Sequence, residues 1–198
     1  SGAYSSGTFG TNPYVLMNWQ NNVNNLYTLA HEFGHSMHSY YSRANQPYQY
    51  ADYSIFVAEV ASTCNEELLF DHLMNTLDDE KQKIYLLNQW LDGFRGTVFR
   101  QTMFAEFEHM IHEMDAKGEA ITADKLTTVY YDLNKKYFGD AMKVDEEIGL
   151  EWARIPHFYY NYYVYQYATG QSAATALSKQ ILEEGQPAVD RYINNFLK

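Results

Sequence analysis

Cysteine is nearly absent from this chain of 198 residues, which contains only Cys64. A single cysteine excludes an internal disulfide and is typical of proteins kept in a reducing compartment, so we expect a cytoplasmic protein. The sequence also lacks any run of about 20 apolar residues, the length that a transmembrane helix needs. These shortages favour a protein that has no membrane partner.

Positive charge is also scarce. The 14 lysine and arginine residues stand against 25 aspartate and glutamate residues, which gives a net charge of −11. Nucleic acids and anionic membrane surfaces attract basic proteins, so this balance argues against both as partners. Because the chain is long enough for a substantial core and no repeat or linker is recognisable, we predict one domain over residues 1–198.

The hydrophobic pattern predicts a mainly α fold with a short strand or hairpin near the N-terminus. Residues 14–19 have the composition of a strand, which would be either an edge strand open to an extended peptide or an internal strand of a hairpin. A 3.6-residue periodicity predicts helices in six segments. These segments are 25–43, 53–76, 79–115, 122–138, 144–168 and 171–197.

The most informative motif is an HExxH pattern formed by His31, Glu32 and His35. On a helix, residues i and i+4 point to nearly the same side, so both imidazoles can bind one metal ion. Imidazole suits Zn²⁺, which in catalytic sites takes three protein ligands and leaves one position for water. We therefore predict one zinc ion per chain, with Glu32 beside it as the general base.

The residues around the motif favour a helix. Asn24 and Asn25 are candidate N-caps, and apolar residues recur at helical spacing from Leu26 to Met37. Gly34 costs this helix about 1 kcal/mol relative to alanine, which indicates that another backbone passes close to it. The alternative is a helix that carries two histidines by chance.

A third zinc ligand must come from another part of the chain. His38 follows His35 by one turn, but three ligands along one helix would strain a tetrahedral site. Glu59 lies in an apolar stretch of the next predicted helix, where an unpaired carboxylate is costly to bury. A metal ion would compensate it, so we predict His31, His35 and Glu59 as the ligands, which is the gluzincin arrangement.

Two further residues of the second helix bear on this site. Glu66 is either a carboxylate that orients a ligand histidine or a solvated helix charge. Cys64 could supply a thiolate ligand, although a small apolar residue of the core is the better interpretation.

Tyrosine is over-used, and six of the 19 tyrosines fall between residues 159 and 167. If this segment is a helix, His157, Tyr160 and Tyr167 share one face and can donate hydrogen bonds to the oxyanion that forms during peptide cleavage. Tyr163 and Tyr165 are the alternatives for these roles. The other interpretation is an aromatic helix buried in the core, with its hydroxyl groups bonded locally.

Residues 106–113 contain a second group of possible metal ligands. It has no matching cluster elsewhere, and helices often carry mixed charges that face solvent, so we predict no second metal ion. The group comprises Glu106, Glu108, His109, His112 and Glu113.

Four stretches of the sequence resemble the oligoendopeptidase F branch of the thimet-type oligopeptidase family. The stretches are 2–5 with 14–18, 29–35, 56–62, and 155–160 leading to 165–170. The resemblance implies zinc ligation by His31, His35 and Glu59, with Glu32 as the base. It also implies that His157 and the tyrosines after it face the substrate. Because members of this family are much longer, it further implies a catalytic-core fragment truncated at both ends.

These observations together predict a zinc-dependent endopeptidase that hydrolyses internal bonds of short peptides. The alternative is a zinc-binding fragment that only binds peptides and does not cleave them. An aminopeptidase is disfavoured, because no Gly-x-Met-Glu-Asn stretch that would anchor a substrate amino terminus precedes the HExxH motif.

Overall fold

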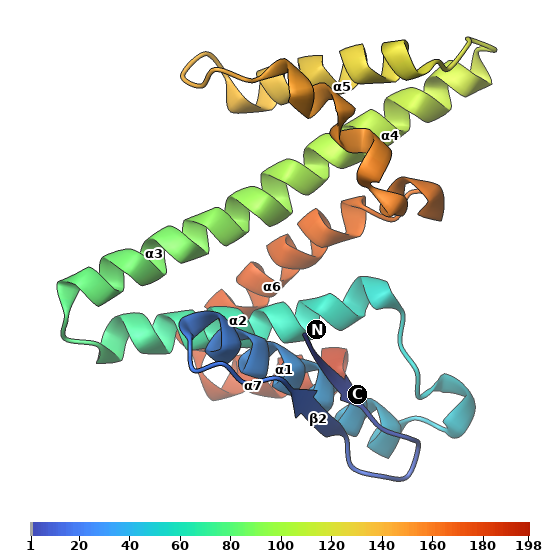
Figure 1. The fold of residues 1–198 in the computed structure, drawn as a ribbon. Coiled ribbons are helices and arrows are strands. Elements are labelled where there is room, and N and C mark those ends of the chain that lie inside the picture. The colour runs from blue at the N-terminus through green and yellow to red at the C-terminus, as the bar shows by residue number, and fades with distance from the viewer. Residues whose placement is uncertain (1) are drawn as a thin grey trace. The chain divides into compact units, whose positions relative to one another are not determined.

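The computed structural model describes residues 2–198, which are mainly helical (Figure 1). The predicted mainly α fold with a short N-terminal hairpin is confirmed. The chain forms two compact units, one through Asp92 and from Gly170 onward, the other from Gly93 to Thr169. One domain over residues 1–198 stays a prediction. Among the described residues, no helix has the length and apolar character needed to span a membrane.

The first unit begins with an antiparallel hairpin of β1 (Ala3–Ser6) and β2 (Tyr14–Met17). Ala3 pairs with Met17, so the predicted strand ends two residues earlier than Trp19. The predicted strand is therefore one of the two strands of a hairpin. Among the described residues the sheet has two strands, so each strand is hydrogen-bonded to the other along one of its two edges.

The helix that carries the HExxH motif is α1 (Val23–Asn45). Asn22 is its N-cap, and the Asn22 side chain accepts a hydrogen bond from the backbone N–H of Asn25 at 2.9 Å. The predicted caps, Asn24 and Asn25, are therefore wrong by two to three residues. Asn22 has the extended backbone that a cap requires, with φ −130° and ψ 165°.

Helix α2 (Ile55–Thr76) lies alongside α1 (Figure 1). The short helix η1 (Tyr48–Tyr50) is in the connection between them. Strand β1 is tied to α1 by its Ser5 hydroxyl, which lies 2.8 Å from the hydroxyl of Ser36. The buried apolar cluster of this unit consists of Val60, Cys64 and Ala174.

One helical run follows α2 where the sequence predicts a single helix over 79–115. It consists of α3 (Glu80–Phe94), the π-helical η2 (Arg95–Phe99) and α4 (Arg100–Ala116). Helix α5 (Ala123–Phe138) then begins after Thr122, whose hydroxyl caps it by accepting a hydrogen bond from the N–H of Lys125.

The predicted continuous helix over 144–168 is wrong. In its place the structure has η3 (Glu146–Arg154), η4 (Pro156–Tyr160) and the start of α6 (Tyr165–Glu184). Pro156 has no N–H to donate and disfavours a helical residue before it, and Ile155 is accordingly extended, with φ −95° and ψ 98°.

The last predicted helix, over 171–197, is divided at Gly185. This residue has φ +67°, a left-handed conformation that glycine adopts easily, and it ends α6. Helix α7 (Gln186–Tyr192) and the π-helical η5 (Ile193–Leu197) follow it.

The second unit has its own core of aromatic and aliphatic side chains. They come mainly from α4 and α5, with two from the segment that follows η3. The buried members are Met103, Phe104, Phe107, Leu126, Tyr130, Leu133, Ile155 and Val164.

Candidate metal centre

His31 and His35 lie one turn apart on α1, and their imidazoles converge. The two Nε2 atoms are 3.1 Å apart, and the rings meet edge to face with their centroids 4.8 Å apart. Both nitrogens therefore point toward one place beside the helix, as the i, i+4 spacing predicts.

The backbones of α1 and α2 come unusually close at Gly34. A Cβ atom on Gly34 would lie 2.5 Å from the Cα of Ser62 and 2.6 Å from the carbonyl oxygen of Ala61. The prediction that another backbone passes close to Gly34 is therefore confirmed. Because the helices approach to this distance, Glu59, nearly one turn before Ser62, can reach the histidines.

Glu59 completes a group of three possible ligand atoms. Its Oε2 lies 3.3 Å from Nε2 of His31 and 3.7 Å from Nε2 of His35. Ligands held at about 2.1 Å by a tetrahedral zinc ion are about 3.4 Å from one another, so these separations fit such an ion. The Ser62 hydroxyl donates to the same Glu59 oxygen at 3.2 Å and fixes its direction.

The electrostatics of this group favour a positive charge at its centre. Burial opposes a charge on His31, but hydrogen bonds to Glu59 and Glu66 outweigh it and raise the His31 pKa to about 10. The pKa of His35 is lowered, first by burial and then by the charge on His31. The hydrogen bond with His31 lowers the pKa of Glu59. The three groups thus attract one cation, whether a proton or a metal ion.

Glu66 also acts on this group, through the far side of the His31 ring. Its Oε1 lies 2.6 Å from Nδ1 of His31. Of the two interpretations of Glu66, the contact favours the one in which this carboxylate orients His31. Such a carboxylate holds the proton on Nδ1, which leaves Nε2 free to coordinate.

Glu32 is buried, with 7% of its surface exposed. It follows His31 directly, so its side chain leaves α1 about 100° around the axis from that ligand. A carboxylate in this position is beside the converging nitrogens and does not join the group of three ligand atoms found among the described residues.

The two alternative ligands lie outside this group. His38 is buried, with its ring stacked on Tyr53 at a centroid distance of 3.6 Å and on Phe196 at 5.3 Å. Cys64 is fully buried in the apolar cluster with Val60. This agrees with its interpretation as a residue of the core.

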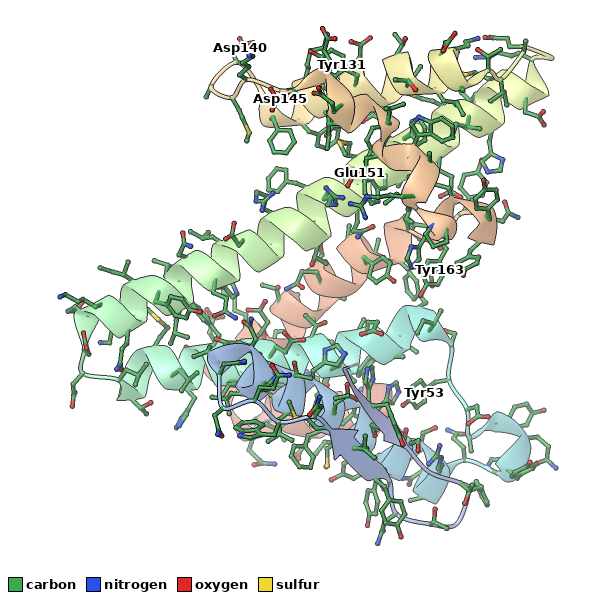
Figure 2. The ribbon with its side chains drawn as sticks, viewed as in Figure 1. Tyr53, Tyr131, Asp140, Asp145, Glu151 and Tyr163 are labelled. Carbon is green, nitrogen blue, oxygen red and sulfur yellow. The ribbon has the colours of Figure 1, made fainter. Side chains whose placement is uncertain are left out.

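The second unit brings His157, Tyr160, Tyr163 and Tyr167 together; we call these four residues the aromatic cluster. The His157 ring centroid lies 5.7 Å from that of Tyr160, 5.7 Å from that of Tyr163 and 6.3 Å from that of Tyr167. Tyr163, labelled in Figure 2, also contacts the rings of Tyr160 and Tyr167. Tyr163, which the sequence predicts only as an alternative, thus contacts all three other members of the aromatic cluster.

The contacts within the aromatic cluster do not arise from a shared helical face. Tyr160 belongs to η4 and Tyr167 to α6, and residues 161–164 between these two elements are not helical. The cluster is also not core, since Tyr160 is 59% exposed and the other three members are half-buried. The interpretation as a buried aromatic helix is therefore wrong for these residues, although the Tyr167 hydroxyl donates a hydrogen bond to that of Tyr163 at 3.5 Å, as local bonding predicts.

All 198 residues of the chain match the family model described as Peptidase family M3. The chain belongs to peptidase family M3. Its sequence is 74% identical to the oligopeptidase PepF of Bacillus subtilis, over 100% of this chain and 29% of that protein. It is 53% identical to an oligoendopeptidase F homolog of Lactococcus lactis, over 98% of this chain and 32% of that protein. The predicted resemblance to the oligoendopeptidase F branch is confirmed.

A solved structure agrees with this placement among the M3 peptidases. The crystal structure of oligoendopeptidase-F from Enterococcus faecium matches with a TM-score of 0.78 and 50% identity. The match covers 88% of this chain and 31% of that chain. The chain therefore spans about a third of the length of the M3 peptidases that it resembles.

The second group of possible ligands on α4 is not gathered at one point in this M3 chain. His109 pairs with Glu113 at 3.6 Å, whereas His112 lies 4.0 Å from Glu108. Among the described residues, the only three-residue ligand group is that of His31, His35 and Glu59.

Sequence reasoning missed Ser62, which holds the Glu59 carboxylate. The signal was present, because residues i and i+3 of a helix are neighbours and Ser62 follows Glu59 by three positions. It also missed that Glu108 of this M3 peptidase chain accepts a hydrogen bond from the backbone of Tyr162, 54 positions away. No local pattern predicts that contact.

Proposed function

We propose that this chain carries the active site of a zinc-dependent endopeptidase that hydrolyses internal bonds of short oligopeptides. The observation that carries the proposal is the convergence of one oxygen and two nitrogens from Glu59, His31 and His35 at separations that suit one zinc ion. The names of the relatives support it, since these M3 proteins are called oligopeptidases or oligoendopeptidases.

In this proposal His31, His35 and Glu59 hold one Zn²⁺ per chain. A bound zinc ion polarises a carbonyl group and lowers the pKa of water to about 7. Glu32 accepts a proton from the attacking water and passes it to the leaving amine, which is general acid–base catalysis. Its burial beside the two histidines suits a group that must act away from bulk water.

For His157, Tyr160 and Tyr167 we propose hydrogen bonds to the substrate and to the oxyanion that forms during cleavage. Donors aimed at such a charge typically contribute about 3–4 kcal/mol each to lowering the barrier. Their imidazole and phenol groups are half-buried or exposed, which supports this role.

The proposed partners are short peptides, with neither nucleic acid nor a membrane. An extended peptide can pair its backbone with a strand edge of the hairpin, which binds peptides with little side-chain selectivity. The proposed location is the cytoplasm, where Cys64 would remain a free thiol.

The proposal is tested by metal content and peptide cleavage measured on the same preparations. Wild type is expected to hold about one zinc per chain and to cleave an internally quenched fluorogenic peptide. Glu59→Ala should lose the metal. Glu32→Gln should keep it but lose activity by about a hundredfold or more, because the general base is gone. Glu183→Gln removes an exposed charge of the same kind from α6 and serves as the control.

The alternative function is peptide binding without cleavage. The chain covers about a third of each relative, so the test must also distinguish binding from cleavage. Wild type that holds zinc and binds the peptide, yet forms no product, would support the alternative. Full cleavage by Glu32→Gln would contradict the proposed mechanism.

A further inference from the structure

The segment that joins η4 to α6 contains two successive residues in the left-handed region. Asn161 has φ 51° and Tyr162 has φ 58°. Asparagine tolerates this conformation, but a tyrosine adopts it rarely, because its Cβ crowds the backbone carbonyl. Such a turn persists only where surrounding contacts hold it.

Glu108 of α4 supplies one of these contacts. Its carboxylate accepts a hydrogen bond from the backbone N–H of Tyr162 at 2.6 Å. Only 3% of the Glu108 side chain is exposed, so the bond is shielded from water. A charged acceptor makes the stronger kind of hydrogen bond, and the carboxylate therefore fixes the peptide unit in the middle of the turn.

His112 lies one turn further along α4 and holds the side chain of the same tyrosine. Its ring stacks on that of Tyr162, with the centroids 4.4 Å apart and the planes at 23°. Its Nε2 lies 4.0 Å from Oε1 of Glu108. Glu108 and His112 thus fix both the backbone and the ring of Tyr162.

This turn separates two members of the aromatic cluster. Tyr160 is the last residue of η4 and Tyr163 follows the turn directly, yet both rings contact His157. Since only the two left-handed residues join them, a change in the dihedral angles of the turn would move Tyr160 away from Tyr163.

We propose that Glu108, assisted by His112, is a positioning residue for peptide binding. By holding the turn at Asn161 and Tyr162, it sets the arrangement in which the aromatic cluster meets the substrate. The inference rests on the proposed function, in which this cluster contacts the peptide. Removing the carboxylate would leave the Tyr162 N–H without its acceptor, so the Tm of each variant is measured beside its affinity.

The test measures peptide affinity in the Glu32→Gln background, where a bound peptide is not cleaved. Glu108→Leu removes the acceptor, whereas Glu108→Gln keeps an acceptor oxygen without the charge. Glu113→Leu is the matched control, because this residue is also on α4 but half of its side chain is exposed. Affinity for a short fluorescein-labelled peptide is read by anisotropy, with zinc content and Tm measured on each variant.

Glu108→Leu is expected to weaken peptide binding by about tenfold to a hundredfold, as misplaced binding groups do, with zinc content unchanged. Its Tm should fall by a few degrees, because the N–H of Tyr162 loses its acceptor, while the chain remains folded at the assay temperature. Glu108→Gln should stay within about threefold of the parent, because the neutral hydrogen bond remains. Glu113→Leu should match the parent.

The inference would be overturned by parental affinity in Glu108→Leu, by equal weakening in the leucine and glutamine variants, or by a loss of affinity that comes with unfolding of Glu108→Leu at the assay temperature. Cleavage by the chain with Glu32 intact is measured separately. Peptide binding without cleavage would refute the proposed endopeptidase activity but would not contradict the positioning role of Glu108. Cleavage, together with an affinity that Glu108→Leu does not change, would support the endopeptidase and refute the positioning role. A parent that binds no peptide would refute both.

Discussion

Gly34 of α1 and Ser62 of α2 are so close that a methyl group on the glycine would overlap the serine backbone, at 2.5 Å from its Cα. Ser62 follows Glu59 by three residues and donates a hydrogen bond to its carboxylate. The distance between the two helices therefore sets whether Glu59 can reach His31 and His35. The glycine within the HExxH motif thus helps to bring the three candidate ligands together, although it is not one of them.

Gly34→Ala is therefore expected to weaken zinc binding and to destabilise the fold. The added methyl group meets backbone, which cannot rotate away, and overpacking of this kind typically costs about 1–3 kcal/mol. Zinc content after gel filtration and Tm by circular dichroism measure both effects. Gly93→Ala is the control: its Cβ would meet nothing within 4 Å. It should raise stability by up to about 1 kcal/mol through helix propensity. Wild-type Tm and zinc content in Gly34→Ala would contradict the helix-contact argument.

Glu66→Ala is expected to lower zinc affinity by about tenfold to a hundredfold, because the carboxylate orients His31 and holds the proton on its Nδ1. Titration of the metal-depleted protein with zinc, in competition with a chelating dye, measures the change. Glu183→Ala removes an exposed carboxylate from α6 and should leave the affinity as it is. Equal affinities in wild type and Glu66→Ala would mean that the 2.6 Å contact does not orient the ligand.

The sequence predicted those parts of the site that depend on local spacing. The HExxH pair and the helix around it follow from a 3.6-residue period, and the close backbone at Gly34 follows from the cost of glycine in a helix. The choice between the two roles of Glu66 needed the separation of α1 and α2. Phe56 lies in the apolar stretch that contains Glu59, yet it is 40% exposed, because an apolar pattern alone does not say which side another element covers.

The segment around the tyrosines could not be predicted in the same way. Its composition fits a helix, but Pro156 interrupts it and the left-handed turn at Asn161 and Tyr162 separates Tyr160 from Tyr163. A contact 54 positions away, from Glu108, accompanies that turn. Periodicity carries no information about such a contact. The sequence therefore could not predict that Tyr163 contacts every other member of the aromatic cluster.

Cys64 is expected to be unreactive in the folded protein. It is fully buried, and burial raises the pKa of its thiol to about 11, so the nucleophilic thiolate is scarce near neutral pH. Labelling with a thiol reagent near pH 8 should proceed only as fast as the chain unfolds and become rapid in denaturant. Rapid labelling of the native protein, at the rate of the denatured control, would show that α2 opens around this residue.

The buried ring of His38 predicts a loss of stability in mild acid. Its side chain is stacked on Tyr53, and its Nδ1 has no hydrogen-bond partner among the described residues. Burial, with a smaller effect of the charge on His35, lowers the His38 pKa from 6.5 to about 4. Between these values the unfolded chain binds a proton at His38 and the folded chain does not. The free energy of unfolding from this source is therefore complete above about pH 6.5 and falls as the pH decreases toward about 4.

His38→Phe keeps an aromatic ring against Tyr53 and Phe196 and removes the titration. Urea unfolding of both proteins in the presence of EDTA, between about pH 7 and pH 5, should show a smaller loss of stability in the variant. The expected difference is about 2 kcal/mol over this range. The other histidines are the same in both proteins, so their protonation cancels in the comparison. Parallel pH profiles would mean that His38 is protonated as readily in the folded chain as in the unfolded one, and that its stacked position does not exclude the charge.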